Sequence, residues 1–187
     1  MCIAEKSIAG IDFVEVDIGK RENLSESFLA LNPLGQVPVL ELDDGTVISE
    51  SMAICRYFEA LHPDPNLFGT TAIEIAKIEQ WNRRMEFEVL LPCSETFRNS
   101  HVFWADKIEQ APAFGEISRK RAINGFDQLE LTLTNREWIA GDRFSVADIT
   151  ALIGIDFGRV SKIRIGDERP NLTRWHRRVS ARPSALA

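Results

Sequence analysis

The chain has 187 residues, 44% of them apolar and 27% charged, which is typical of a soluble globular protein large enough to bury its own core. The net charge of −6 argues against nucleic acid or an anionic membrane surface as the main partner, because phosphate binding needs a clustered excess of Lys and Arg. No apolar run approaches the ~20 residues of a membrane-spanning helix, and the first residues do not follow the pattern of a signal peptide.

The N-terminal residues alternate between helix and strand signals. Residues 1–6 read as the last turns of a helix. Apolar residues alternate with acidic ones over 11–18, which predicts a short, partly exposed strand. Residues 25–31 predict a short helix that ends before Pro33, because the residue preceding a proline is pushed out of the helical region.

A hairpin signal follows. Residues 37–42 and 46–48 predict two strands joined by a turn at Asp43-Asp44-Gly45. Ser49-Glu50-Ser51 then opens a helix, whose apolar residues at helical spacing are Ile54, Tyr57, Phe58 and Leu61. The predicted order up to this point is strand, helix, hairpin and helix.

From Thr71 onward the chain carries only helix signals. One long helix is broken near Pro92, and a second begins near Pro112. Ser145 and Asp148 have the spacing of a capping box that begins a third helix. A final helix has Leu172, Trp175 and Val179 on one face. We therefore predict an α/β domain over 1–64, a linker over 65–70 and an all-helical domain over 71–187.

Several motifs in this order resemble the cytosolic glutathione S-transferase family, in its bacterial type. They are N-P-L-G-Q-V-P-V-L from Asn32, D-D-G-T-V-I-S-E-S-M-A-I-C-R-Y-F from Asp43, F-S-V-A-D-I-T from Phe144, and the terminal W-H-R-R-V-S-A-R-P from Trp175. The resemblance spans essentially the whole chain. It implies a thioredoxin-like N-terminal domain followed by a helical bundle, usually in a homodimer.

The resemblance also implies a glutathione half-site. In the family, the bond corresponding to Val37–Pro38 is cis, and the backbone of the residue before the proline pairs with the cysteinyl backbone of glutathione. A tripeptide can bind in this way as an added strand. Taken alone, the sequence equally allows a trans proline on an edge strand, because only about 5–6% of X–Pro bonds are cis.

Glu50 and Ser51 are the second part of the predicted half-site. They stand where a helix begins, so unpaired amides and a positive dipole end favour a carboxylate ligand. The resemblance implies that Ser51 donates to the γ-glutamyl carboxylate and that Glu50 pairs with the ammonium group. The alternative is that Ser51 or Ser49 only caps the helix. Gln36 is a weaker candidate for the glycyl end, and a solvated loop residue is an equal alternative.

The catalytic side chain is expected upstream of Met1. In the family, a Tyr, Ser or Cys at the start of the first helix stabilises the glutathione thiolate, and this chain opens with the second half of that helix. The preceding strand would lie between the strands predicted over 11–18 and 37–42. Its loss from the sheet would leave unpaired backbone and a hole in the core.

Other chemistry-bearing residues give weaker signals. Cys2 and Cys55 read as helix residues, whereas Cys93, after Pro92, is a candidate for a thiol bordering a cleft. His101, in a loop between long helices, is a candidate for the second-substrate pocket. No cysteines or histidines have metal-ligand spacing, and the cysteine pattern predicts a reducing, cytoplasmic setting without a bound metal.

The resulting prediction is a transferase that binds glutathione as cosubstrate and conjugates its thiolate to a small electrophilic or hydrophobic substrate. Two alternatives stay open: a non-catalytic glutathione-binding or regulatory paralogue, and a glutathione-dependent thiol reductase or peroxidase. Neither nucleic acid nor a membrane is expected as a partner, and the resemblance implies a homodimer.

Overall fold

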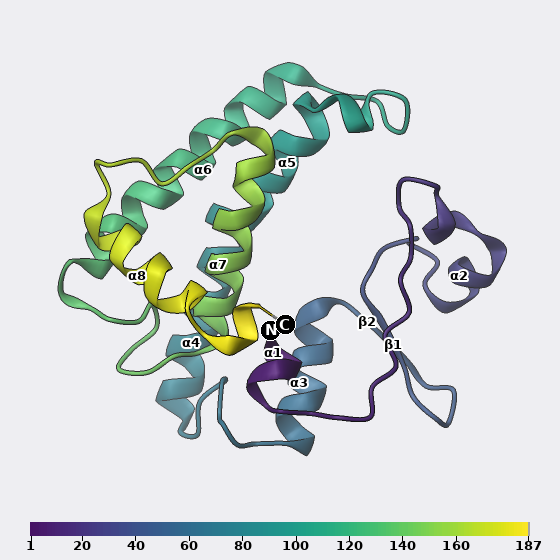
Figure 1. Cartoon of the computed structure of the whole chain (residues 1–187), viewed down its shortest axis with the longest axis horizontal. Coiled ribbons are helices and arrows are strands. Elements are labelled where there is room, and N and C mark those ends of the chain that lie inside the picture. The colour runs from purple at the N-terminus through teal and green to yellow at the C-terminus, as the bar shows by residue number, and fades with distance from the viewer. Residues whose placement is uncertain (187) are drawn as a thin grey trace. The chain divides into compact units, whose positions relative to one another are not determined.

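A computed structural model describes residues 1–186, which divide into two compact units. Cys2–Pro65 forms the first, and the chain from Asn66 onward makes up the body of the second. Figure 1 labels their elements. The domain limits predicted from the sequence, 1–64 and 71–187 with a linker between them, remain a prediction.

The first unit carries short elements and one helix of three turns. In chain order they are α1 (Cys2–Glu5), η1 (Glu22–Leu24), α2 (Glu26–Leu31), β1 (Val39–Glu41), β2 (Val47–Ser49) and α3 (Ser51–Leu61). The Ser25 side chain caps α2 by accepting from the Phe28 amide at 3.2 Å. On α3, Ile54 and Phe58 are buried as predicted, but Leu61, its last residue, is 56% exposed.

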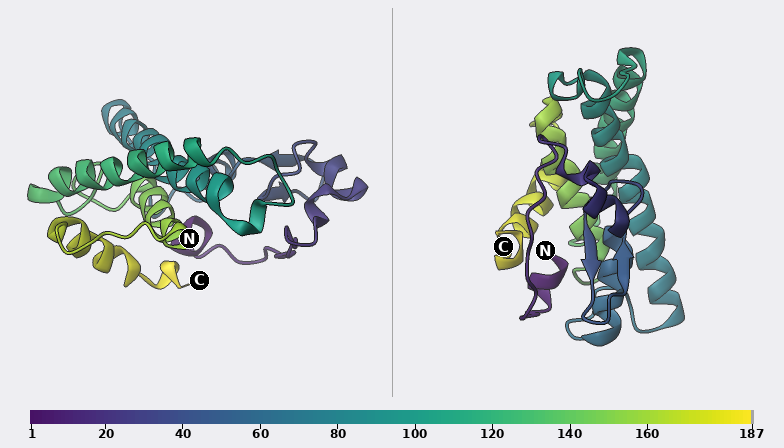
Figure 2. Two further views of the ribbon diagram at one scale, coloured as in Figure 1. Left: turned by 90° about the horizontal axis from the view of Figure 1, so that it is seen from above. Right: turned by 90° about the vertical axis from the view of Figure 1, so that its right-hand side faces the viewer.

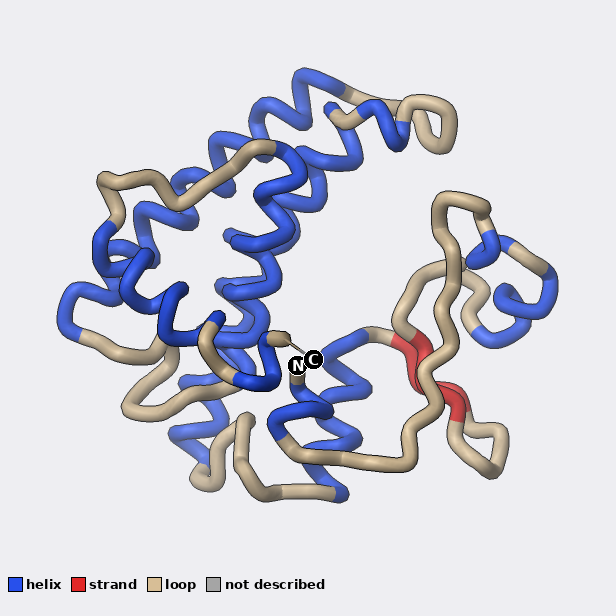
Figure 3. Tube along the Cα trace, viewed as in Figure 1, coloured by secondary structure: helices blue, strands red, loops and turns tan. Residues whose placement is uncertain are grey.

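The two strands form an antiparallel hairpin, drawn in red in Figure 3. Val39 lies opposite Ser49, and Glu41 lies opposite Val47. The connecting turn is closed by an Asp44 carboxylate that accepts from the Thr46 amide at 2.8 Å. Gly45 adopts a φ of 82°, which glycine reaches without steric cost. The predicted hairpin is therefore confirmed, with shorter strands than the sequence indicates.

The strand predicted over 11–18 is not present in the structure. These residues pair with no other strand in the described chain, and the side chains of Phe13 and Val14 are 81% and 85% exposed. A strand is stabilised by its ladder hydrogen bonds and by its neighbours on one face, so alternating apolar residues alone do not make one.

A buried lysine fixes α1 against α3 within the first unit. The Lys6 side chain has no exposed surface, and its ammonium group lies 2.6 Å from a Glu59 carboxylate oxygen. The same group donates to the carbonyl of His62 at 2.6 Å and to that of Pro65 at 3.0 Å. All three N–H donors of the ammonium thus have an acceptor, which a buried lysine needs.

The second unit is helical. Its main helices are α4 (Ala72–Met85), α5 (Leu91–Ser100), α6 (Pro112–Thr132), α7 (Val146–Gly158) and α8 (Pro170–Ser180). Short single-turn segments follow α5, α6, α7 and α8 at Val102–Trp104, Leu133–Asn135, Arg159–Ser161 and Pro183–Ala185. Leu172, Trp175 and Val179 are buried on α8, as the sequence predicts. None of the helices in the described part is both long and apolar enough to span a bilayer.

The break expected near Pro92 takes the form of a π-helical segment, Glu86–Leu90, between α4 and α5. Proline has no amide hydrogen, so Pro92 cannot close an α-helical bond to the Glu88 carbonyl. Gly125 of α6 lies against that carbonyl, and Gly154 of α7 lies against Leu90, where a Cβ would come within 2.9 Å of the Leu90 Cα. Figure 2 shows α5 and α6 side by side. The two glycines therefore let α6 and α7 pack closely on the π-helical segment.

The predicted capping box begins α7, and its Asp148 carboxylate also binds two segments outside the start of that helix. One Asp148 oxygen accepts from the Ser145 amide at 3.0 Å and from the Ser145 hydroxyl at 3.1 Å. The other accepts from the Ile139 amide at 3.1 Å and from the Trp175 indole at 2.8 Å. Burial raises the pKa of Asp148, although these four donors favour the ionised form. One fully buried carboxylate thus joins the loop before α7, the start of α7 and α8.

We expect Asp148→Ala to lower the free energy of unfolding by about 3 kcal/mol or more, because it leaves buried donors on Ile139 and Trp175 without an acceptor. Ser145→Ala should cost only about 0.5–2 kcal/mol, the usual range for a lost cap. Urea denaturation measures both. Asp142→Ala, at an exposed position of the same loop, is the matched control and should stay within about 0.5 kcal/mol of wild type. Equal effects of Asp148→Ala and Asp142→Ala would contradict the assignment.

Candidate glutathione half-site

The hairpin brings the two predicted halves of the site to one end of the sheet. Val39 and Ser49 are the last paired residues of their strands at this end. Val37-Pro38 precedes Val39, and Glu50-Ser51 follows Ser49, so both pairs leave the ladder together. All four residues are exposed. Residues separated by a turn and two strands in sequence therefore share one surface of the first unit.

The Val37–Pro38 peptide bond is cis, as the resemblance implies. The loop before it is fixed by Asn32, which is buried and was not predicted to have a role. The Asn32 side chain donates to the Gln36 carbonyl at 2.7 Å and accepts from the Leu34 amide at 3.2 Å. The Gln36 side chain itself is exposed. The only sequence signal for this brace was an Asn at a helix end, a residue type that readily bonds to nearby backbone.

Glu50 has an unusual backbone conformation at the start of α3. Its φ is 72° and its ψ is 120°, which side-chain-bearing residues rarely adopt. Its carbonyl accepts the first helical bond, from the Ile54 amide at 3.0 Å, and no side chain caps the helix. The amides of the first turn have no partner within the helix and carry its positive dipole end. Neither Ser49 nor Ser51 therefore caps α3 with its side chain, in contrast to the alternative considered from the sequence.

The remaining candidates lie in the second unit and have structural contacts. Cys93 is fully buried, and burial raises the pKa of its thiol to about 12, so it is a packing residue and not a reactive thiolate. His101 Nδ1 accepts from the Phe103 amide at 3.2 Å, and its ring lies tilted against that of Phe97, with 4.8 Å between the two ring centroids. Within residues 1–186, no group of three or more potential ligands is arranged to hold a metal ion.

Comparison with known proteins decides the family. The model of the glutathione S-transferase N-terminal domain matches residues 1–61, and that of the C-terminal domain matches residues 101–183. Glutathione S-transferase 2 of Saccharomyces cerevisiae is 37% identical over an alignment of 187 positions, which covers 98% of this chain and 80% of that protein. This chain belongs to the glutathione S-transferase family. It accordingly has a thioredoxin-like N-terminal domain, with a two-stranded ladder among the described residues, and a helical C-terminal domain.

Two further comparisons show a similar solved structure and a relative with a different name. The crystal structure of Gtt2 from Saccharomyces cerevisiae superposes with a TM-score of 0.94 at 37% sequence identity, covering 99% of this chain and 90% of that chain. A probable elongation factor 1-gamma 1 of Arabidopsis thaliana is 33% identical over 97% of this chain. This chain spans 45% of that relative's length. This chain is thus also similar in sequence to part of a protein that is not named a transferase.

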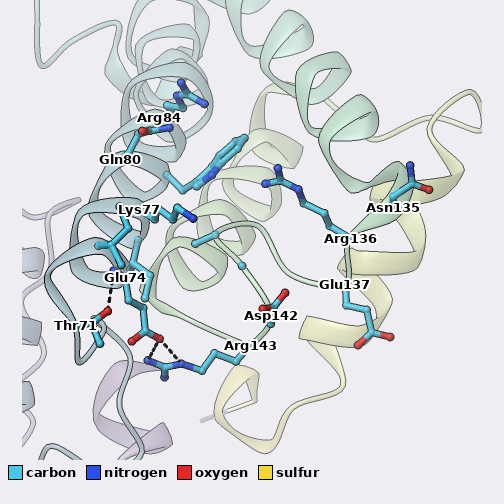
Figure 4. A pocket seen from close by; sticks show the side chains of 15 residues that line it. Thr71, Glu74, Lys77, Gln80, Arg84, Asn135, Arg136, Glu137, Asp142 and Arg143 are labelled. Carbon is cyan, nitrogen blue, oxygen red and sulfur yellow. Dashed lines mark hydrogen bonds and ion pairs between the residues drawn. The ribbon is translucent and has the colours of Figure 1, made fainter.

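A polar recess of about 1030 Å³ lies in the helical domain, between α4 and the loop before α7 (Figure 4). Glu74 of α4 forms an ion pair with Arg143 at 2.5 Å, and Arg143 also binds Asn66. The Thr70 amide and the Arg143 guanidinium hold the pKa of Glu74 at about 2. None of the predicted half-site residues lines this recess. The ion pair between Glu74 and Arg143 joins α4 to the loop that leads into α7.

The conformation of Glu50 predicts that glycine is preferred there over alanine. Glycine adopts a φ of 72° without steric cost, whereas alanine keeps the strain, which is of order 1–3 kcal/mol. We therefore expect Glu50→Gly to be more stable than Glu50→Ala by about 1 kcal/mol in urea denaturation. Glu41→Gly and Glu41→Ala, on β1, should show the reverse order, since glycine weakens a strand. The same order at both positions would contradict the interpretation.

Proposed function

We propose that this protein binds glutathione at the half-site formed by Val37, Pro38, Glu50 and Ser51 and conjugates its thiolate to small electrophiles. The observation that carries the proposal is the ladder register, which leaves the Val37–Pro38 turn and the open N-terminus of α3 at one end of the hairpin. Membership of the glutathione S-transferase family supports the same ligand.

Each part of glutathione has a suitable group at this surface. Val37 is an exposed residue, and we propose that its backbone N–H and C=O pair with the cysteinyl residue, in the manner of an added strand. The γ-glutamyl carboxylate is matched by the Ser51 hydroxyl and the unpaired amides of α3, and its ammonium group by the Glu50 carboxylate. Gln36 adjoins this surface and is proposed to contact the glycyl end.

Conjugation would proceed by attack of the glutathione thiolate on an electrophilic carbon. The enzyme accelerates this step by favouring the thiolate over the thiol and by holding it beside the second substrate. Among residues 1–186 we assign no side chain to the activation of the thiol, and the burial of Cys93 removes it from that role. The electrophile is proposed as a small hydrophobic molecule, as in the sequence-based prediction.

A glutathione-binding protein without transferase activity is the second candidate. The similarity to a probable elongation factor 1-gamma over nearly the whole chain favours it, because that relative's name denotes no transferase. Binding without turnover would distinguish this candidate from the first. We also propose that the protein is a cytoplasmic homodimer, and gel filtration of the intact chain at micromolar concentration tests the oligomeric state.

Titration calorimetry of the intact chain with reduced glutathione tests the half-site. We expect saturable binding that weakens about 10- to 100-fold in Ser51→Ala and in Glu50→Gln, since hydrogen bonds to charged groups contribute about 1.5–3 kcal/mol. Turnover is then measured with an aryl halide as electrophile.

Glu41→Gln provides the matched control for the titration. It removes the same charge from the other end of the same hairpin and should leave the dissociation constant unchanged. The half-site would be ruled out by a folded wild-type chain that binds no glutathione, or by a Glu50→Gln variant with wild-type affinity.

A further inference from the structure

The polar recess of the helical domain has no part in the proposed function. Its volume is about 1030 Å³, and all the residues that line it belong to the second unit. One side is a face of α4 that carries Lys77, Trp81 and Arg84 at helical spacing. The other side is the connection from α6 to α7, which contributes Arg136. Small-molecule sites commonly have volumes of about 300–1,000 Å³, so the recess is large enough for a small organic ligand.

The charged side chains that line the recess leave an excess of cations. Glu74 is paired with Arg143, with 2.5 Å between the carboxylate oxygen and the guanidinium nitrogen. Glu137 is paired with Arg178 of α8, outside the lining, at 3.2 Å. Within residues 1–186, the lining cations whose side chains form no hydrogen bond or ion pair are Lys77, Arg84 and Arg136. The lining carboxylate without such a partner in the same part of the chain is that of Asp142.

Two of these cations lie against the ring of Trp81. The guanidinium carbon of Arg84 is 4.8 Å from the ring centroid, and that of Arg136 is 5.7 Å from it. A guanidinium that rests on an aromatic ring is already oriented, so less conformational freedom is lost when it binds an anion. The indole therefore holds cations from both sides of the recess close to one another.

Lys77 completes the arrangement from the turn of α4 before Trp81. Figure 4 shows the side chains of Lys77 and Arg136 extending toward each other from the two sides of the recess. Like charges that face each other repel, and an anion placed between them is attracted by both. The arrangement favours an anion although the chain as a whole has a net charge of −6.

We propose that the recess binds a small molecule through a phosphate group held between Lys77 and Arg136. A phosphate monoester carries a charge of about −1.5 to −2 at pH 7 and so neutralises two cations, whereas a carboxylate neutralises one. The planar guanidinium and the ammonium group together offer donors to several phosphate oxygens. Arg84 adds a third positive charge beside the same ring. This inference is independent of the proposed function, because none of the half-site residues lines the recess.

Titration calorimetry of the intact chain with pyrophosphate, at constant low ionic strength, tests the site. We expect saturable binding, and we expect acetate to bind at least about 10-fold more weakly, since it makes fewer charge-assisted hydrogen bonds. The start of α3 could also attract an anion, so the titration is repeated with excess glutathione, which should leave the binding of pyrophosphate unchanged. A folded chain that binds no pyrophosphate, or that binds it only in the absence of glutathione, would overturn the proposal.

Charge variants locate the bound anion. Arg136→Gln and Lys77→Gln should each weaken pyrophosphate binding about 10- to 100-fold. Asp142→Asn should strengthen it, because the change removes a negative charge from the lining. This opposite sign is not expected if these exposed side chains have only a structural role.

The matched controls are Lys120→Gln on α6 and Arg177→Gln on α8. Both residues are exposed and lie outside the lining, and each variant removes the same charge as its counterpart in the recess. They should leave the dissociation constant unchanged, and circular dichroism confirms that every variant is folded. Equal weakening by the controls and by the recess variants would show that binding follows the overall charge of the protein, which would refute the site.

Discussion

The register of the β1–β2 ladder is the constraint on which the proposed site depends. Side chains alternate between the two faces of a strand, so a shift of one residue would turn every side chain of that strand to the opposite face. It would also displace the Val37–Pro38 turn from the start of α3. The register is fixed at the far end by the turn at Asp44 and Gly45, and at the near end by the change from strand to helix at Glu50. We assign no catalytic group to either end of the hairpin. Both ends nevertheless determine where the groups that would bind the ligand lie.

The strained backbone of Glu50, at the end of the hairpin next to α3, is held by the structure on both sides of it. The conformation of Glu50 is unfavourable, but it lets the chain pass from the last ladder pair into α3 within one residue. The amides exposed by this abrupt start are the groups that would bind a carboxylate. In the loop before Val37, the Asn32 side chain forms the hydrogen bonds that backbone groups would form within a helix or a strand. Asp148 does the same in the helical domain, where one carboxylate holds three segments.

Sequence reasoning succeeded where the signal was local. The hairpin turn, the capping box and the buried face of α8 each follow from residue types at fixed spacing, and the structure contains all three. It failed where the outcome depends on a partner distant in sequence. The alternation over 11–18 describes a strand only if another strand lies beside it. The bonds made by the Asn32 side chain and the burial of Lys6 likewise arise from packing that the sequence pattern does not show. Cys93 was considered for a cleft, and only the packing of the helices shows that it is buried.

Helix α3 carries the proposed binding groups at one end and a buried charge at the other. Ser51 lies in its first turn, at the proposed ligand site. Glu59, two turns later, forms the ion pair with the buried ammonium group of Lys6 at 2.6 Å. The same ammonium group binds the carbonyls of His62 and Pro65, just beyond the end of the helix. Because an α-helix is rigid over this length, the contacts that fix the last turn also fix the position of the first. The direction in which the amides of the first turn point therefore depends on a lysine that is distant from the proposed ligand.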